Sequence, residues 1–249
     1  MSYNKRLFGF IGVLLLLLVL FLGITSRYYF IAPKKAVEDA VASEQTFSDI
    51  RYNAGYTTKK FSISMGRNKL SQKQLSDHLQ LYAGYVAKRN EIAESLSVVK
   101  KDNVNPSYSV FRGLKVGETF ARNGALLHEL YFENIGTGTQ MEELTQKFII
   151  DNFGSIDSFK QDLMATALSA RGWAITCYNL DDQHVCNYLL DAHNERVPVL
   201  TVPLLVIDTY EHAYMIDFGI DRKTYLAILW ENINWDVVEA RVKRWAISG

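Results

Sequence analysis

The sequence predicts an α+β protein in which long helices precede short strands, with one apolar helix in front of them. Three stretches carry this expectation. Leu7 to Ile24 is an unbroken apolar run, Ser71 to Val86 repeats apolar residues at helical spacing, and Leu204 to Ile207 has the pattern of a short buried strand.

The composition is that of a chain with a substantial core. Of 249 residues, 48% are hydrophobic and 12% aromatic, which is enough for one or two domains. Lysine plus arginine and aspartate plus glutamate both number 27, so the formal net charge is zero. A nucleic-acid-binding protein usually carries a basic face, and this composition indicates none. We therefore expect no nucleic-acid partner.

The first 25 residues are predicted to be a membrane anchor. Lys5 and Arg6 precede residues 7–24, which carry no charge and as a helix would span about 27 Å, close to the thickness of a hydrocarbon core. A cleaved signal peptide is the alternative, but its apolar core is usually shorter and ends at a small-residue site. A short basic N-terminus usually stays inside. We expect a single-pass protein of the inner (cytoplasmic) membrane, in contact with the lipid bilayer through residues 7–24. The rest of the chain would then lie outside the cytoplasm, in a periplasmic or extracellular location.

Residues 26–59 are expected to form a stalk. Pro33 follows the membrane exit, and Val37 to Asp49 has the pattern of one amphipathic helical stretch. The composition indicates a spacer and nothing more specific.

Two histidines lie on predicted helices. Ser71 and Gln74 have the spacing of a capping box, and the helix that follows carries His78 on its apolar stripe. His128 is the one ionisable residue expected to be buried in the apolar helix around it. A buried imidazole needs a partner, which is either a hydrogen bond or a metal ion.

A carboxylate and an imidazole follow the last predicted strand. Asp208 comes directly after the run Leu204 to Ile207, and His212 comes four residues later, where a helix is expected to begin. Such a pair can bind one metal ion, and its neutral nitrogen and anionic oxygen suit iron or manganese. The spacing alone is weak, because a capping aspartate or surface polar residues produce it as well.

Five separated motifs resemble those of the iron/manganese superoxide dismutases. The sequence from Asp208 to Tyr214 is similar to the family's Asp-x-Trp-Glu-His-Ala-Tyr, with Tyr210 in place of the Trp. The other four occur in the family's order: Leu127 to Asn134 (with Phe132 replacing a Trp), Phe153 to Lys160, Gly172-Trp173, and Trp230 to Val238. The resemblance covers the chain from about Lys60 to its end.

This resemblance implies a fold and an activity. The fold would be an α-helical hairpin domain at residues 60–136, followed by an α/β domain with a small antiparallel sheet at residues 137–249. The anchor at residues 1–25 and the stalk at residues 26–59 would be additions. The activity would be that of a superoxide dismutase, which converts superoxide to O2 and hydrogen peroxide at one Fe or Mn ion per chain. In the topology predicted above, this catalytic domain would lie outside the cytoplasm.

The resemblance also implies roles for single residues. Tyr85 is similar to the family's tyrosine that orients metal-bound solvent, and Glu211 would bond His212 of the partner subunit in a homodimer. The implied metal ligands are His78, His128, Asp208 and His212.

The first ligand has an alternative. In the family the tyrosine lies eight residues after the first histidine, whereas Tyr85 lies seven residues after His78. Counted without a gap, the ligand position falls on Asp77. We favour His78, because it lies on the apolar stripe.

The family's outer-sphere glutamine is missing. The two positions that correspond to it hold Gly124 and Ser169. His193 is the candidate substitute, and a histidine in a surface loop is the competing interpretation. The missing glutamine also motivates an alternative function, in which the chain is a metal-binding structural or interaction subunit without dismutase activity.

Two cysteines flank Asp181-Asp182. If these two aspartates form a two-residue hairpin loop, Leu180 pairs with Gln183, and Cys177 falls opposite Cys186 at a non-hydrogen-bonded position. The spacing suits a cross-strand disulfide in an oxidising compartment. Two small buried hydrophobic residues are the alternative.

Overall fold

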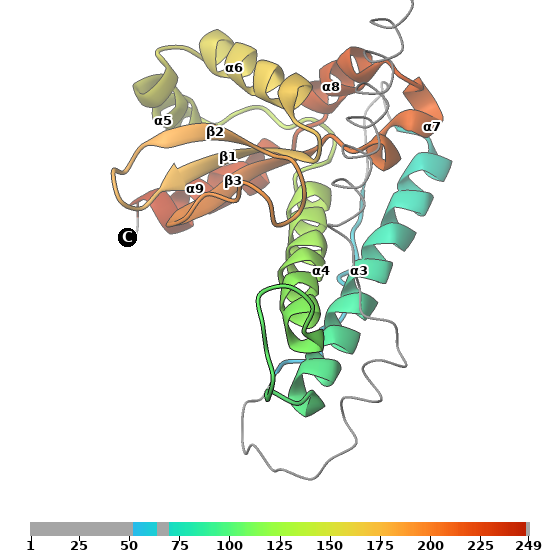
Figure 1. The fold of residues 1–249 in the computed structure, drawn as a ribbon. Helices are drawn as coiled ribbons and strands as arrows, with labels where there is room; N and C mark the ends of the chain where they lie inside the picture. The colour runs from blue at the N-terminus through green and yellow to red at the C-terminus, as the bar shows by residue number, and fades with distance from the viewer. Residues whose placement is uncertain (1–51, 64–69, 248–249) are drawn as a thin grey trace, which may run out of the picture.

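The structure, a computed structural model, describes residues 52–63 and 70–247. In this part of the chain, a long pair of helices stands against a small sheet that is covered by further helices (Figure 1). The sheet is antiparallel throughout. The predicted combination of a helical hairpin with a small antiparallel sheet is therefore confirmed.

The predicted membrane helix at residues 7–24 lies outside the described residues. Among the helices that the structure does describe, none is both long and apolar enough to cross a bilayer. This finding contradicts the predicted single-pass location in the cytoplasmic membrane, with a catalytic domain outside the cytoplasm. We withdraw that prediction together with the predicted lipid contact.

The hairpin consists of α3 (Gln72–Val98) and α4 (Val110–Glu133). Each helix begins after a serine whose hydroxyl accepts a hydrogen bond from the backbone N–H three residues on. The distances are 3.0 Å from Gln74 N to Ser71 Oγ and 3.3 Å from Arg112 N to Ser109 Oγ. Such caps contribute about 1 kcal/mol each. The predicted helix start at Ser71 is thus confirmed.

Residues 52–63 lie along this hairpin. Glu129 of α4 is 2% exposed, although the apolar pattern of its helix had not marked it as buried. The Tyr56 hydroxyl donates to Glu129 Oε2 at 2.8 Å, and Lys59 Nζ lies 3.1 Å from the same oxygen. The Tyr82 hydroxyl donates to Oε1 at 2.9 Å. These three partners offset the cost of burying the carboxylate, so the end of the predicted stalk packs against the helices.

The sheet contains β1 (Trp173–Asn179), β2 (Val185–Leu190) and β3 (Thr201–Asp208) in the order β2-β1-β3. All seven residues of the central strand β1 are buried. The helix α6 (Ile156–Ser169) packs on β1 and β2, whereas α4 and α9 (Trp235–Val242) pack on β3 (Figure 1). The other elements are α5 (Glu143–Phe153), η2 (Glu211–Ala213), α7 (Met215–Phe218), α8 (Arg222–Glu231) and η3 (Lys243–Ile247).

The β1–β2 hairpin has the predicted register but a wider turn. Cys177 pairs with Cys186 as expected. The predicted pairing of Leu180 with Gln183 is wrong, because Leu180 N donates instead to Leu200 O at 2.8 Å. Asn179 N donates to the carbonyl of His184 at 2.8 Å. Since hydrogen-bonded and non-hydrogen-bonded pairs alternate, this bond places the cysteines at a hydrogen-bonded position, not at the predicted non-hydrogen-bonded one.

Candidate metal centre

Asp208 is fixed at the point where β3 ends. It pairs with Trp173 at the start of β1 and is 0% exposed. Its Oδ1 accepts a hydrogen bond from Tyr210 N at 2.9 Å, and its backbone carbonyl accepts one from the Tyr225 hydroxyl at 2.8 Å. The chain then turns into η2, which carries His212. One carboxylate oxygen, Oδ2, is left to face the histidines.

Three histidines converge on that oxygen. His78 comes from α3, His128 from α4 and His212 from η2. Their Nε2 atoms lie 3.1 Å, 3.6 Å and 3.1 Å from Asp208 Oδ2, respectively. One ligand atom from each of the four residues can be chosen so that all four lie within 4.8 Å of one another. The structure therefore brings together all four residues that the sequence suggested as ligands.

The donor atoms fit a metal ion. His128 Nδ1 donates to Gly124 O at 2.6 Å, which fixes the tautomer and leaves Nε2 with a lone pair. This Nε2 is buried and has no hydrogen-bond partner within the described part of the chain. An orphaned buried acceptor is costly. A cation between the four residues would remove that cost.

The charges of the four groups also suit a cation. Burial by itself would raise the pKa of the Asp208 carboxyl, but His212 and His78 hold that pKa well below its usual range. Burial lowers the pKa of both His78 and His128. The site thus offers one carboxylate and neutral imidazole nitrogens, a donor set typical of iron, manganese and other first-row ions.

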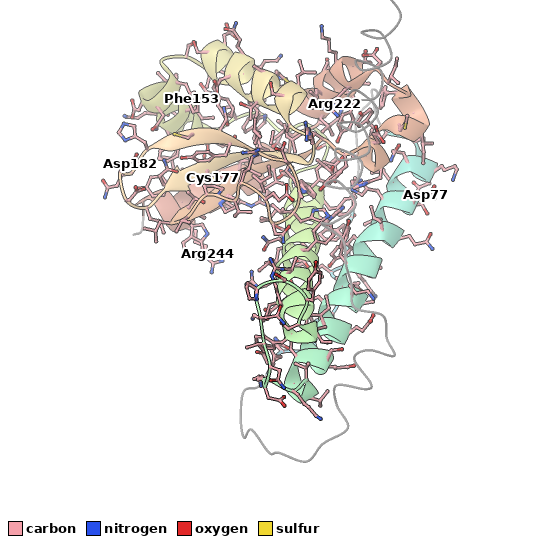
Figure 2. The ribbon with its side chains drawn as sticks, viewed as in Figure 1. Asp77, Phe153, Cys177, Asp182, Arg222 and Arg244 are labelled. Atoms are coloured by element: carbon pink, nitrogen blue, oxygen red, sulfur yellow. The ribbon has the colours of Figure 1, made fainter. Side chains whose placement is uncertain are left out.

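Asp77 does not belong to this cluster. Its carboxylate pairs with Lys73 at 2.7 Å, and its side chain is 46% exposed. Figure 2 shows Asp77 on the outer side of α3. His78 is buried at the cluster instead. The geometry therefore favours His78 over Asp77 as the first ligand.

Tyr85 occupies the space that a longer side chain at position 124 would need. Its ring centroid lies 5.1 Å from that of His128. A Cβ added at Gly124 would meet the Tyr85 ring at 2.7 Å, closer than such atoms approach in proteins. The position of the Tyr85 ring therefore leaves no room at position 124 for the glutamine that the family resemblance implies there.

His193 reaches the site from the loop after β2. It is 0% exposed, so the interpretation of a surface-loop histidine is wrong. Trp173 Nε1 donates to His193 Nδ1 at 2.9 Å, which places the imidazole proton on Nε2. That Nε2 is buried and lacks a hydrogen-bond partner among residues 52–63 and 70–247. The ring centroids of His193 and Tyr85 are 4.6 Å apart.

Gln74 is a residue of the site that sequence reasoning missed. The capping-box spacing assigned its side chain to the start of the helix. Instead, Gln74 Nε2 donates to His212 O at 2.5 Å, and Gln74 Oε1 accepts from Ile216 N at 3.1 Å. The backbone around His212 is thereby tied to α3. Nothing in the local sequence distinguishes this role from capping.

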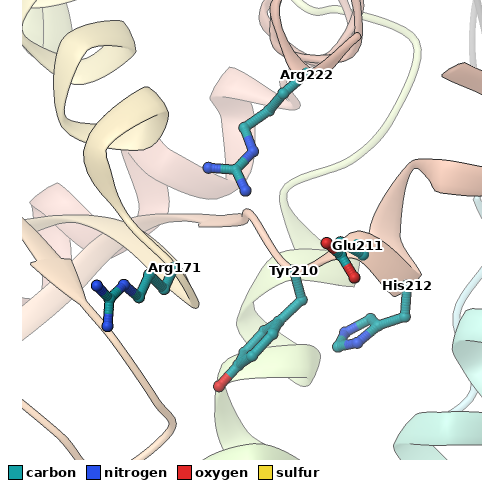
Figure 3. A pocket seen from close by; sticks show the side chains of 5 residues that line it. All are labelled: Arg171, Tyr210, Glu211, His212 and Arg222. Carbon is teal, nitrogen blue, oxygen red and sulfur yellow. The ribbon is translucent and has the colours of Figure 1, made fainter. Parts of the chain in front are cut away.

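A cavity of about 490 Å³ opens beside His212. Its lining residues are Arg171, Tyr210, Glu211, His212 and Arg222 (Figure 3). The His212 side chain is 28% exposed, whereas those of the other three clustered residues are 0% exposed. The Tyr210 ring stacks on His212 at a centroid distance of 5.0 Å. His212 is therefore the one member of the cluster that borders this cavity, which two arginines also line.

Known proteins are similar to this chain over most of its length. The chain is 40% identical to "Superoxide dismutase [Fe]" of Aquifex aeolicus over 181 residues, which cover 70% of this chain and 85% of that protein. The similarity to the protein of the same name from Aquifex pyrophilus has the same extent. The chain belongs to the iron/manganese superoxide dismutase family.

The matched proteins include some named for iron and some named for manganese. Residues 141–241 match the family described as "Iron/manganese superoxide dismutases, C-terminal domain". "Superoxide dismutase [Mn] 2" of Haloferax volcanii is 27% identical over 165 residues, which cover 66% of this chain and 81% of that protein. Relatives in the superoxide dismutase family thus carry either metal in their names.

Proposed function

We propose that the chain is a superoxide dismutase that holds one iron or manganese ion between His78, His128, Asp208 and His212. Family membership supports the activity, and one observation carries the site: three imidazole Nε2 atoms face a single buried carboxylate oxygen. We also propose that the helical domain ends near residue 136 and the α/β domain begins at residue 137.

The reaction converts two superoxide anions and two protons to O2 and hydrogen peroxide. A bound iron or manganese ion supplies the acceptor for one electron and the donor for the next. The protein supplies an anion-attracting site, because one carboxylate does not cancel the charge of a divalent or trivalent cation. Phe132 and Trp173 lie against the histidines, with ring centroids 4.8 Å from His78 and 5.0 Å from His128, and keep bulk water out.

We propose that Tyr85 and His193 act next to the metal as the outer-sphere pair. Both rings lie beside His128, with centroid distances of 5.1 Å and 5.8 Å. The proton on His193 Nε2 provides a hydrogen-bond donor in place of the glutamine amide that the family resemblance implies. In this interpretation His193 substitutes for that amide, and Tyr85 orients solvent beside the metal site.

Replacing His193 by alanine should lower the rate of superoxide decay by about 10–100-fold while the metal content stays near wild type, the usual cost of losing an outer-shell partner. His193→Gln should restore part of the rate, because it again offers an N–H donor. His184→Ala is the matched control, since that histidine lies on the exposed hairpin turn. Wild-type activity in His193→Ala would contradict the assignment.

We further propose a homodimer in which Glu211 of each subunit bonds His212 of the partner subunit. Glu211 is exposed next to the partly exposed His212. Met215 and Ile216 on the same segment are 46% and 48% exposed, which suits an interface that buries them. Sedimentation of the full chain at several concentrations tests this assembly.

Removing the metal should abolish dismutase activity, and adding iron or manganese back should restore that activity. The full chain, chelated and then reconstituted, is expected to bind about one iron or manganese ion, because residues 52–63 and 70–247 contain one cluster of four candidate ligands. Metal analysis and superoxide decay are measured on the same samples. A chain that binds the ion but leaves the decay rate unchanged would support the alternative, a metal-binding subunit without dismutase activity.

A further inference from the structure

The two cysteines lie directly opposite each other in neighbouring strands. Cys177 of β1 pairs with Cys186 of β2, and both are free thiols. Figure 2 marks Cys177 on the sheet, away from the helical hairpin. Paired residues of adjacent strands point to the same face. At a hydrogen-bonded position their Cα atoms are about 5.5 Å apart, which is within the usual range for a disulfide.

Polar side chains surround this pair. Asn179 Nδ2 donates to Cys186 Sγ at 3.7 Å, and the Tyr188 hydroxyl donates to Asn179 Oδ1 at 3.1 Å. The two thiols also differ in access, because Cys186 is half-buried whereas Cys177 is 0% exposed. The accessible cysteine is thus also the one whose sulfur accepts a hydrogen bond from an amide.

We propose that Cys177 and Cys186 form a dithiol that hydrogen peroxide converts to a cross-strand disulfide. Cys186 reacts first, because it is the more exposed of the two thiols and because the Asn179 amide holds its sulfur in place. Cys177 is the resolving residue, held opposite by the strand pairing. The source of the peroxide rests on the proposed dismutase function, which makes hydrogen peroxide. The geometry of the two cysteines does not depend on that function.

The chemistry balances with hydrogen peroxide as the oxidant. The Cys186 thiolate attacks one oxygen of the peroxide, the O–O bond breaks, and sulfenic acid and water form once the leaving hydroxide takes up the thiol proton. The Cys177 sulfur then attacks the Cys186 sulfur, the S–O bond breaks, and a second water leaves with the Cys177 proton. Two thiols are oxidised and one peroxide is reduced to two waters. Burial raises the pKa of Cys177 to about 12, which agrees with Cys186, and not Cys177, being the residue that meets the peroxide first.

The test treats the metal-loaded full chain with reagent hydrogen peroxide. Thiol titration of the denatured protein and intact mass should show the loss of both thiols and of two hydrogens per chain, reversed by dithiothreitol. In Cys177→Ser, dimedone should trap a sulfenic acid on Cys186. In the matched variant Cys186→Ser, Cys177 should stay a free thiol. Cys177 and Cys186 belong to the sheet and not to the four-residue cluster, so metal content serves as the folding control for both variants.

Three results would overturn the proposal. These are two titratable thiols after peroxide treatment, a disulfide between two chains, or dimedone labelling of Cys177 in place of Cys186. The metal-free chain separates this inference from the dismutase function, because reagent peroxide should oxidise its dithiol equally well. A superoxide source should oxidise the thiols of the metal-loaded chain, and catalase should prevent it. Failure of that last step alone overturns the claim that the protein's own product is the oxidant.

Discussion

Replacing Asp208 by asparagine is expected to abolish metal binding and dismutase activity while the protein stays folded. Asp208 supplies the only anion among the four proposed ligands, and its Oδ2 is the point on which the three histidines converge. Loss of an outer-shell partner already costs about 10–100-fold in metal affinity or activity, so loss of the central anion should exceed that range.

The metal-free fold should tolerate this change. Asparagine keeps the shape of the side chain, and its oxygen can still accept the hydrogen bond from Tyr210 N. Its amide can donate to the neutral nitrogens of His78 and His212, so no buried charge is left without a partner. Replacing a buried ionic group by a well-fitted neutral one is often neutral for stability or favourable.

Thermal unfolding with and without metal separates the two effects. Metal should raise the unfolding temperature of the wild type, because it binds the folded state only. The Asp208→Asn variant should unfold near the temperature of the metal-free wild type whether or not metal is added. An added-metal shift of wild-type size in this variant would contradict the assignment of Asp208.

The parts of the fold that repeat a simple period were predictable from the sequence. The stripe that carries His78 and the short strand before Asp208 both became buried elements, because helical and strand periods place apolar residues on one face. The pairing of Cys177 with Cys186 was predictable because the turn is centred on Asp181-Asp182, even though it is wider than the predicted two residues. These features depend on local sequence alone.

The parts that depend on contacts between distant elements were not predictable. Gln74 satisfies the local rule for a capping box, yet its side chain bonds to the backbone of His212, 138 residues away. Glu129 has the sequence signature of a surface residue, and its burial depends on the hydroxyls of Tyr56 and Tyr82 and the ammonium of Lys59. His193 lies in a loop whose burial depends on Trp173. Each side chain gains its partner from another segment, which a local pattern does not contain.

The helix pattern and the family spacing select different residues as the first ligand. Spacing without a gap selects Asp77, whereas the apolar stripe selects His78. In the structure, α3 runs without interruption from Gln72 to Val98 and buries His78, which is 1% exposed. Two adjacent residues on one helix point about 100° apart, so only one of them can face the hairpin partner.

His78→Ala should therefore lose metal and activity by more than about 100-fold, since outer-shell losses alone reach that size. Asp77→Ala should bind metal and decompose superoxide as the wild type does. Its cost in stability should stay near 0.3–0.5 kcal/mol, about the contribution of an exposed ion pair one helical turn apart such as the one with Lys73. Metal analysis and superoxide decay on the same preparations measure both effects.

The alanine at position 78 also leaves a space in the core, so a second variant is needed. His78→Gln fills most of that space and lacks the imidazole nitrogen, and it should fold and still lose the metal. Circular dichroism of the metal-free proteins shows whether each variant is folded. If Asp77→Ala loses the metal while His78→Gln retains it, the helix aligns with the family without a gap, and the assignment of His78 is wrong.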